Sequence, residues 1–175
     1  HKHSEDTGGN PMTKWHCEWQ GNFPHTEVYF NKKDEQIKNR KADVHISEHS
    51  FVVEFQHSVI EKKEVDEREH DYAMHKQKVL WVIDGNDGIR AYKLKDRRIF
   101  LEFTELWKFQ SFHKNAYIDI DGQIYAFSPN RVKSCMIDTG PPVAKNDFIK
   151  AVKDGKKPTY ASDIPQCTLT IKQQG

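Results

Sequence analysis

Cysteine is scarce in this sequence, which has only Cys17, Cys135 and Cys167 and no CxxC pair. A disulfide framework and a cysteine-rich zinc site are therefore both disfavoured, and we expect an intracellular protein, cytoplasmic or nuclear. No hydrophobic run approaches the roughly eighteen residues of a membrane-spanning helix, so no membrane partner is expected. The net charge is only +1. It decides nothing about nucleic acid, because such partners require a basic face rather than a basic average.

The sequence does contain enough apolar material for one hydrophobic core. It has 175 residues, of which 36% are hydrophobic, and ten Phe, six Tyr and four Trp are spread along it. A chain of this length buries a sizeable core as a single domain. We therefore predict one domain over residues 1–175, with a core over about 11–90 and a C-terminal α+β extension over about 91–175.

Hydrophobic periodicity predicts a helix and three strands in the first part of the chain. Pro11 suits the first turn of a helix, with Asn10 as its candidate cap, and the helix would run over residues 13–21. Strands follow over residues 25–30, 41–46 and 51–55. A tight polar turn separates the last two strands, which predicts a β-hairpin.

A long helix and a buried strand come next. Ser58 and Glu61 have the spacing of a capping box, which predicts a helix over about 59–77. Residues 78–84 form a nearly continuous apolar run, typical of a strand buried on both faces and reached by a parallel crossover. This order of elements predicts an α/β core. Beyond residue 90 the expected elements are strands over 98–103 and 117–127, the second folding back at Asp121-Gly122, and helices over 104–109 and 146–154.

Polar residues on the hairpin form the candidate reaction centre. Asp43 lies near the middle of one strand and Glu54, eleven residues later, lies near the end of the next, so the turn brings the two carboxylates together. Mg²⁺ prefers oxygen ligands, and the main-chain carbonyl of Phe55 is placed to add a third. Gln56 shares a face with Glu54, where it could position water or contact a phosphate. The spacing alone is weak evidence, since carboxylates on strand faces are common.

The order of four short motifs is more specific than this spacing. They are an R-x-A-D-V strand at residues 40–44, an E-F-Q-x-S strand end at 54–58, an E-R-x-x-x-Y helix element at 67–72 and a W-V-I-D strand at 81–84. In this order they resemble the core of the competence-protein CoiA-like nucleases, a branch of the PD-(D/E)XK nucleases. The resemblance implies an α/β fold with a PD-(D/E)XK restriction-endonuclease-like core, in which helices flank a central mixed β-sheet.

The resemblance also implies an activity, namely metal-dependent hydrolysis of phosphodiester bonds in DNA. Asp43, Glu54 and the Phe55 carbonyl would bind Mg²⁺ or Mn²⁺, and the activated water would attack a phosphate beside Gln56. DNA is the expected partner. Nucleases that cut both strands are often dimers, so a homodimer is a further possibility to test.

The likeness extends into the first helix, with two departures. Thr13 and His16 match the family's S-x-x-H spacing, so His16 is expected to face the site as a catalytic residue. Met12 stands where the family has Glu, and Gln20 replaces its Lys. Glu18 is the nearest acidic residue and is kept as a second candidate for the site, since it points about 200° round the helix from His16.

Basic and aromatic residues near this centre are the candidates for phosphate contacts. Arg68 and Tyr72 are i,i+4 neighbours on the second helix and could share a face toward the site, where Arg68 would offset transition-state charge. The predicted DNA contacts are Arg40, Lys41, Lys62 and Tyr72, since phosphate contacts dominate non-specific affinity.

Two other classes of function stay open. The departure at Met12 favours a catalytically inactive nucleic-acid-binding module with the same fold, whereas the intact carboxylate pair favours an enzyme. A zinc-stabilised interaction domain would use His1, His3, His16 and Cys17, but adjacent residues rarely satisfy one tetrahedron.

Overall fold

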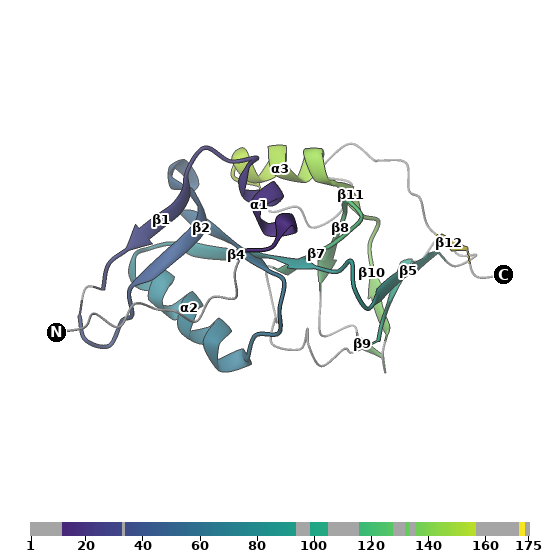
Figure 1. The fold of residues 1–175 in the computed structure, drawn as a ribbon, viewed down its shortest axis with the longest axis horizontal. Coiled ribbons are helices and arrows are strands. Elements are labelled where there is room, and N and C mark those ends of the chain that lie inside the picture. The colour runs from purple at the N-terminus through teal and green to yellow at the C-terminus, as the bar shows by residue number, and fades with distance from the viewer. Residues whose placement is uncertain are drawn as a thin grey trace.

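The computed structural model describes residues 12–32, 34–93, 99–104, 116–127, 132–133, 136–156 and 172–173. Its largest feature is a seven-stranded sheet in the order β1-β2-β3-β4-β7-β8-β11 (Figure 1). The middle strands β3 (Phe51–Gln56), β4 (Lys78–Asp84) and β7 (Ala116–Ile120) run parallel, and antiparallel strands adjoin them on both sides. This is the predicted α/β arrangement with a central mixed sheet.

The hairpin that carries the candidate site forms where the sequence predicts it. β1 (Thr26–Phe30) pairs antiparallel with β2 (Arg40–Ile46), and β2 pairs antiparallel with β3. A short 3-10 turn, η1 (Ser47–His49), joins β2 to β3. The hairpin thereby brings Asp43 and Glu54 to neighbouring strands.

The first helix, α1 (Lys14–Gln20), begins after a cap that differs from the predicted one. The hydroxyl of Thr13 accepts a hydrogen bond from the His16 amide N–H at 3.2 Å, which satisfies one of the free N–H groups of the first turn. Thr13 is therefore the N-cap, while Asn10 and Pro11 lie outside the described residues.

The second helix, α2 (Lys62–Met74), starts later than predicted. Glu61 is its N-cap and makes no side-chain capping bond, so the predicted capping box with Ser58 is wrong. One tertiary contact and one local hydrogen bond account for the extended start. Ile60 is buried in the core, and the carbonyl of Ser58 accepts a hydrogen bond from Gln56 Nε2 at 2.7 Å.

The end of α2 is also earlier than predicted, because a left-handed residue closes the helix. Lys76 has a φ of 58°, and the amide N–H groups of Lys76 and Gln77 bond to the carbonyls of Ala73 and Tyr72. This is a Schellman-type ending, which satisfies the last carbonyls of the helix.

The C-terminal half is built into the main sheet rather than appended to it. β7 and β8 (Gln123–Phe127) form the hairpin predicted at Asp121-Gly122, where both turn residues have positive φ. β7 pairs with β4, and β11 (Val143–Ala144) pairs with β8 just before α3 (Lys145–Lys153). The main sheet thus continues beyond residue 90, where the sequence places the end of the core. Residues 105–109 of the predicted short helix lie outside the described part.

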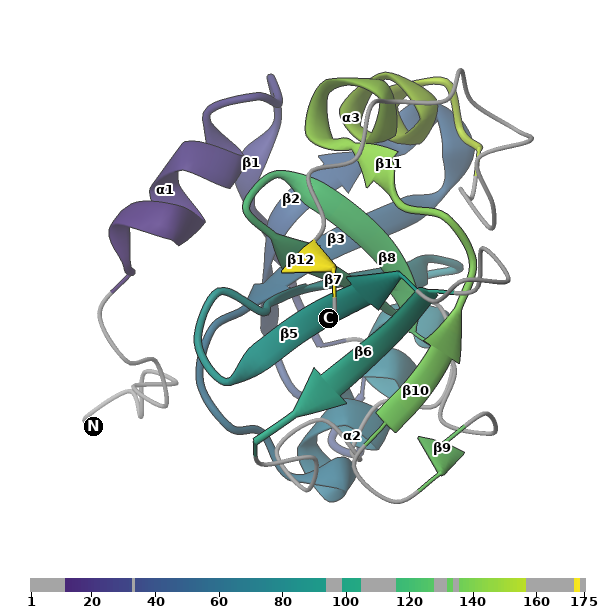
Figure 2. The same ribbon diagram turned by 90° about the vertical axis from the view of Figure 1, so that its right-hand side faces the viewer.

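A second, five-stranded sheet has the order β12-β5-β6-β10-β9 and faces the viewer in Figure 2. Its strands are β5 (Ile89–Lys93), β6 (Ile99–Phe103), β9 (Val132–Lys133), β10 (Met136–Thr139) and β12 (Lys172–Gln173). The buried side chains of β6 join the core that also contains α2. Among the described residues, no helix combines the length and hydropathy needed to cross a membrane.

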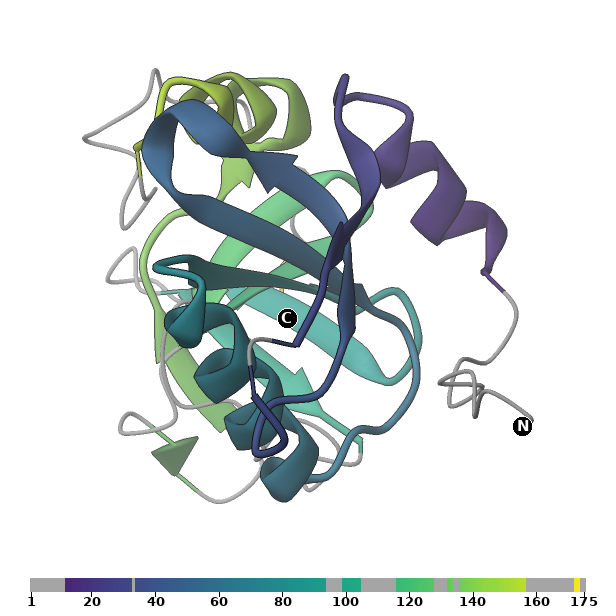
Figure 3. The same cartoon turned by 90° about the vertical axis from the view of Figure 1, so that its left-hand side faces the viewer.

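Helix α2 lies on one face of the main sheet and α1 and α3 lie on the other (Figure 3), and a hydrophobic core lies on each face. One contains Tyr72 of α2 and Trp81 of β4, and we call it the α2-side core. The other contains Trp19 of α1, Phe55 of β3 and Phe148 of α3, and we call it the α1/α3-side core. Because both faces are covered, the central strands need apolar residues at nearly every position.

Candidate metal centre

Asp43 lies where β2 separates from β3. The pairing of these strands reaches Val44 opposite Val53. On either side of Asp43 the chain faces different cores, since Ala42 belongs to the α2-side core and Val44 to the α1/α3-side core. The alternation of a regular strand is thus interrupted at Asp43. In the gap, Oδ2 of Asp43 accepts a hydrogen bond from the Phe55 amide N–H at 2.8 Å.

Glu54 is the second carboxylate, and it is only 3% exposed. The Tyr72 hydroxyl donates to its Oε1 at 2.5 Å, and Nη1 of Arg68 lies 3.6 Å from the same oxygen. Burial and, after it, the Asp43 carboxylate raise the pKa of Glu54 to about 8. Arg68 lowers this pKa only in part, so the charged form of Glu54 needs a further positive charge nearby to become favourable.

Glu27 is a third carboxylate at this point, and the sequence reasoning missed it. β1 and β2 pair on both sides of Glu27, which places it opposite Asp43. One ligand atom each from Glu27, Asp43 and His16 lie within 4.8 Å of one another. The Gln20 side-chain amide donates to Oε1 of Glu27 at 2.7 Å, and Lys41 forms an ion pair with its other oxygen.

His16 faces the carboxylates, as the resemblance implied. Its Nε2 lies 3.2 Å from Oδ1 of Asp43, and that nitrogen is buried without a hydrogen-bond partner among the described residues. The imidazole packs edge-on against the Phe55 ring, with a centroid separation of 5.6 Å. A buried ring nitrogen beside carboxylate oxygens is a donor set suited to a metal ion.

Because of the departures at Met12, just before α1, and at Gln20, this part of the chain brings no acidic residue to the site. Met12 is exposed, and Glu18 pairs with Lys14 at 3.7 Å on the solvent side, so Glu18 does not serve as a substitute. Gln20 instead reaches the centre, because its Nε2 also lies 3.3 Å from the main-chain oxygen of Asp43. It links α1 to β2 and to Glu27.

Asp119, in β7, holds α1 in place. Trp15 and Trp19 both donate their indole N–H to Oδ2 of Asp119 at 2.9 Å, and the Gly122 amide N–H donates to Oδ1 at 2.9 Å. The Asp119 carboxylate is buried. A helix of seven residues is not stable alone, so these bonds determine where its His16 lies.

Replacing Asp119 by Ala is expected to lower the free energy of unfolding by about 2–4 kcal/mol, because the buried Trp19 indole N–H and the partly buried Trp15 indole N–H lose their acceptor. Asp119→Asn keeps one acceptor oxygen and should cost less. Urea denaturation measures both, with the exposed Asp87→Ala as the control. An Asp119→Ala protein as stable as the control would contradict this account.

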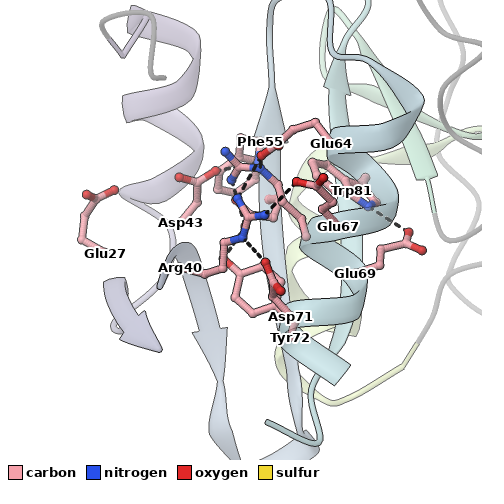
Figure 4. A network of polar contacts seen from close by, with 12 residues as sticks. Glu27, Arg40, Asp43, Phe55, Glu64, Glu67, Glu69, Asp71, Tyr72 and Trp81 are labelled. Carbon is pink, nitrogen blue, oxygen red and sulfur yellow. Dashed lines mark hydrogen bonds and ion pairs between the residues drawn. The ribbon is translucent and has the colours of Figure 1, made fainter. Parts of the chain in front are cut away.

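Arg40 is not available as the predicted DNA contact. It is 3% exposed, its Nε donates to Asp71 at 2.6 Å and its Nη1 donates to Glu64 at 2.9 Å (Figure 4). Glu64 also accepts from Nε of Arg68 at 2.8 Å. The network ties β2 to α2. Tyr72 is likewise fully buried, so it acts on the carboxylate inside the protein and not as a surface contact.

The remaining predicted residues have distinct surroundings. The Gln56 side-chain amide bonds to the Ser58 carbonyl rather than to either carboxylate. The Lys41 side chain is 46% exposed and forms an ion pair with Glu27, so Lys41 is an exposed predicted DNA contact beside the carboxylates. Lys62 is exposed in the first turn of α2 and pairs with Asp66 at 2.5 Å.

The zinc-domain alternative gains no support from the described residues. Cys17 is exposed, and the described group that could hold a metal ion joins His16 to carboxylates rather than to Cys17. His1 and His3 lie outside the described part.

The fold and the site together define an α/β domain with a mixed sheet and an acidic centre where two strands separate. Residues 6–162 match the family model described as competence protein CoiA, nuclease-like domain, and the chain belongs to this family. The match includes the β7–β8 hairpin and α3 as well as the four motifs. No curated protein and no solved structure matches the chain.

Proposed function

We propose that this chain is a metal-dependent nuclease that hydrolyses phosphodiester bonds in DNA. The observation that carries the proposal is the meeting of His16, Glu27 and Asp43 within 4.8 Å beside the buried Glu54. Membership of a family described as nuclease-like supports the same reading. DNA as the substrate is the prediction drawn from the sequence resemblance.

The residues at this centre fit a divalent cation. Carboxylate oxygens dominate the donor set, the Nε2 of His16 is buried without a hydrogen-bond partner in the described part, and the Glu54 carboxyl is buried. Asp43 and Glu54 would hold the ion, with the Phe55 carbonyl as a further predicted ligand. When bound, such an ion supplies Lewis-acid stabilisation of phosphate charge and lowers the pKa of a water molecule.

The surrounding groups hold the carboxylates in place. The Phe55 amide N–H fixes one oxygen of Asp43, and the Tyr72 hydroxyl fixes one oxygen of Glu54. Such outer contacts orient ligands and reduce the reorganisation needed during reaction. Arg68 adds a guanidinium group next to Glu54, and the half-exposed Lys41 offers an ammonium group to a DNA phosphate.

Cleavage assays with labelled single-stranded, duplex and branched DNA test this proposal. We expect cleavage in the presence of Mg²⁺ or Mn²⁺, complete loss in EDTA, and recovery when the ion is added back in excess. DNA binding without cleavage under every condition would favour the inactive binding module. If the protein neither binds nor cleaves DNA, both the nuclease function and the binding-module function are contradicted.

A further inference from the structure

The backbone of Glu27 is unusual for a residue inside a strand. Its φ is 55°, in the left-handed region, whereas β1 pairs regularly with β2 on both sides of it. A residue other than glycine in this region costs about 1–3 kcal/mol and persists only where its surroundings require it. An ion pair with Lys41 does not require it, because long side chains on adjacent strands reach each other from ordinary β conformations.

The surroundings of Glu27 point instead to the metal centre. Its carboxylate, the carboxylate of Asp43 and Nε2 of His16 offer one donor atom each, all within 4.8 Å. The His16 nitrogen is buried and makes no hydrogen bond to the described residues. Gln20 donates both to Glu27 Oε1 and to the Asp43 main-chain oxygen, so it orients the two residues together.

We propose that Glu27 binds the divalent cation together with His16 and Asp43, and that this nitrogen-containing donor set selects Mn²⁺ over Mg²⁺. The inference rests on the proposed metal-dependent function and deepens it. Glu27 supplies an acidic group from β1, whereas Met12 stands just before α1 where the resemblance implies Glu.

The preference for Mn²⁺ follows from the imidazole. Mg²⁺ dehydrates reluctantly and is bound through oxygen ligands in near-ideal octahedra. First-row transition ions accept imidazole nitrogen more readily, so one His among carboxylates shifts selectivity toward them. His16 is the residue that supplies this nitrogen, since its Nε2 lies 3.2 Å from Asp43 Oδ1.

The role of Glu27 can be tested without relying on catalysis by titrating Mn²⁺ into the 175-residue chain. The electron paramagnetic resonance signal of the free ion measures how much Mn²⁺ remains unbound. Glu27→Gln is expected to weaken Mn²⁺ binding at least about tenfold. Glu27→Gly should weaken Mn²⁺ binding by as much. Glycine tolerates the positive φ, so the Glu27→Gly protein should stay folded, and its loss of binding would not be caused by unfolding. The matched control is Glu48→Gln, an exposed acid in η1, which should bind as the wild type does.

Competition with Mg²⁺ in the same titration tests the selectivity. Wild type should bind Mn²⁺ at least about tenfold more tightly than Mg²⁺, and His16→Gln should narrow that ratio. The inference is overturned if the wild type binds no Mn²⁺, if the wild type prefers Mg²⁺, or if the Glu27→Gln protein binds Mn²⁺ normally. If Mn²⁺ binding depends on Glu27 but no DNA is cleaved, the inference stands and the proposed nuclease function fails.

Discussion

Replacing Asp43 by Asn is expected to lower the rate of DNA cleavage by at least about 10³-fold, since a lost ligand removes several kcal/mol of transition-state stabilisation. Asn has the shape of Asp but lacks the charge that binds a cation. The Phe55 amide N–H can still donate to its side-chain oxygen, so the fold should be retained. Single-turnover cleavage of a labelled oligonucleotide, with circular dichroism to confirm folding, measures the effect.

The control for this variant removes one carboxylate elsewhere. Glu48 lies exposed in η1, outside the group formed by His16, Glu27 and Asp43, so Glu48→Gln should cleave at the wild-type rate. Full activity in the Asp43→Asn protein would show that Asp43 is not a ligand. Equal loss in both variants would show that net charge, and not the centre, sets the rate.

The Glu54→Gln substitution is expected to stabilise the metal-free protein increasingly as the pH rises. The pKa of Glu54 is raised from 4.5 to about 8, first by burial and second by Asp43. Below pH 4.5 the carboxyl is protonated in both the folded and unfolded chains. Between pH 4.5 and 8 the unfolded chain loses this proton while the folded chain keeps it, so folding stability falls over this interval.

The amide introduced by Glu54→Gln carries no titrating proton, so the difference in unfolding free energy between variant and wild type should grow by roughly 2–4 kcal/mol from pH 5 to pH 9. The side-chain oxygen of that amide can still accept from the Tyr72 hydroxyl. Urea denaturation in EDTA at several pH values measures the difference, and Glu48→Gln again provides the control. A difference that stays constant across this range would contradict the raised pKa.

The stability gain expected in Glu54→Gln and the loss of cleavage expected from removing Asp43 have the same physical origin. Burial, and after it repulsion from the neighbouring Asp43 carboxylate, disfavours the charged form of Glu54. A bound cation reverses this repulsion. The centre is thus destabilising without an ion, which is typical of sites selected for chemistry rather than for folding.

Arg40 shows why a basic residue on its own could not be assigned from the sequence. Arginine is mostly exposed in proteins, so a surface role was the reasonable expectation. The partners that bury it, Asp71 and Glu64, follow 31 and 24 residues later, and only the packing of α2 on β2 brings them together. The predicted helix start near Ser58 was wrong for a related reason, because burial of Ile60 outweighed the local capping pattern.

Glu27 was missed because its role depends on strand register. The segment around it predicts an ordinary strand, and in such a strand a charged residue usually faces solvent. Its position opposite Asp43 appears only when β1 is paired with β2. No local pattern predicts the left-handed backbone conformation of Glu27, since the residues that usually adopt this conformation are glycine and asparagine.

The sequence by itself determined the elements whose signals are local. The apolar run of β4 predicted a buried strand reached by a parallel crossover, and the β2–β3 hairpin predicted that Asp43 and Glu54 lie close together. Tertiary structure alone decided which polar groups join them. His16 reaches the centre because Asp119, a hundred residues further along the chain, binds the Trp19 indole. Short-range patterns determine secondary structure, whereas hydrogen bonds and ion pairs between distant residues depend on how the elements pack.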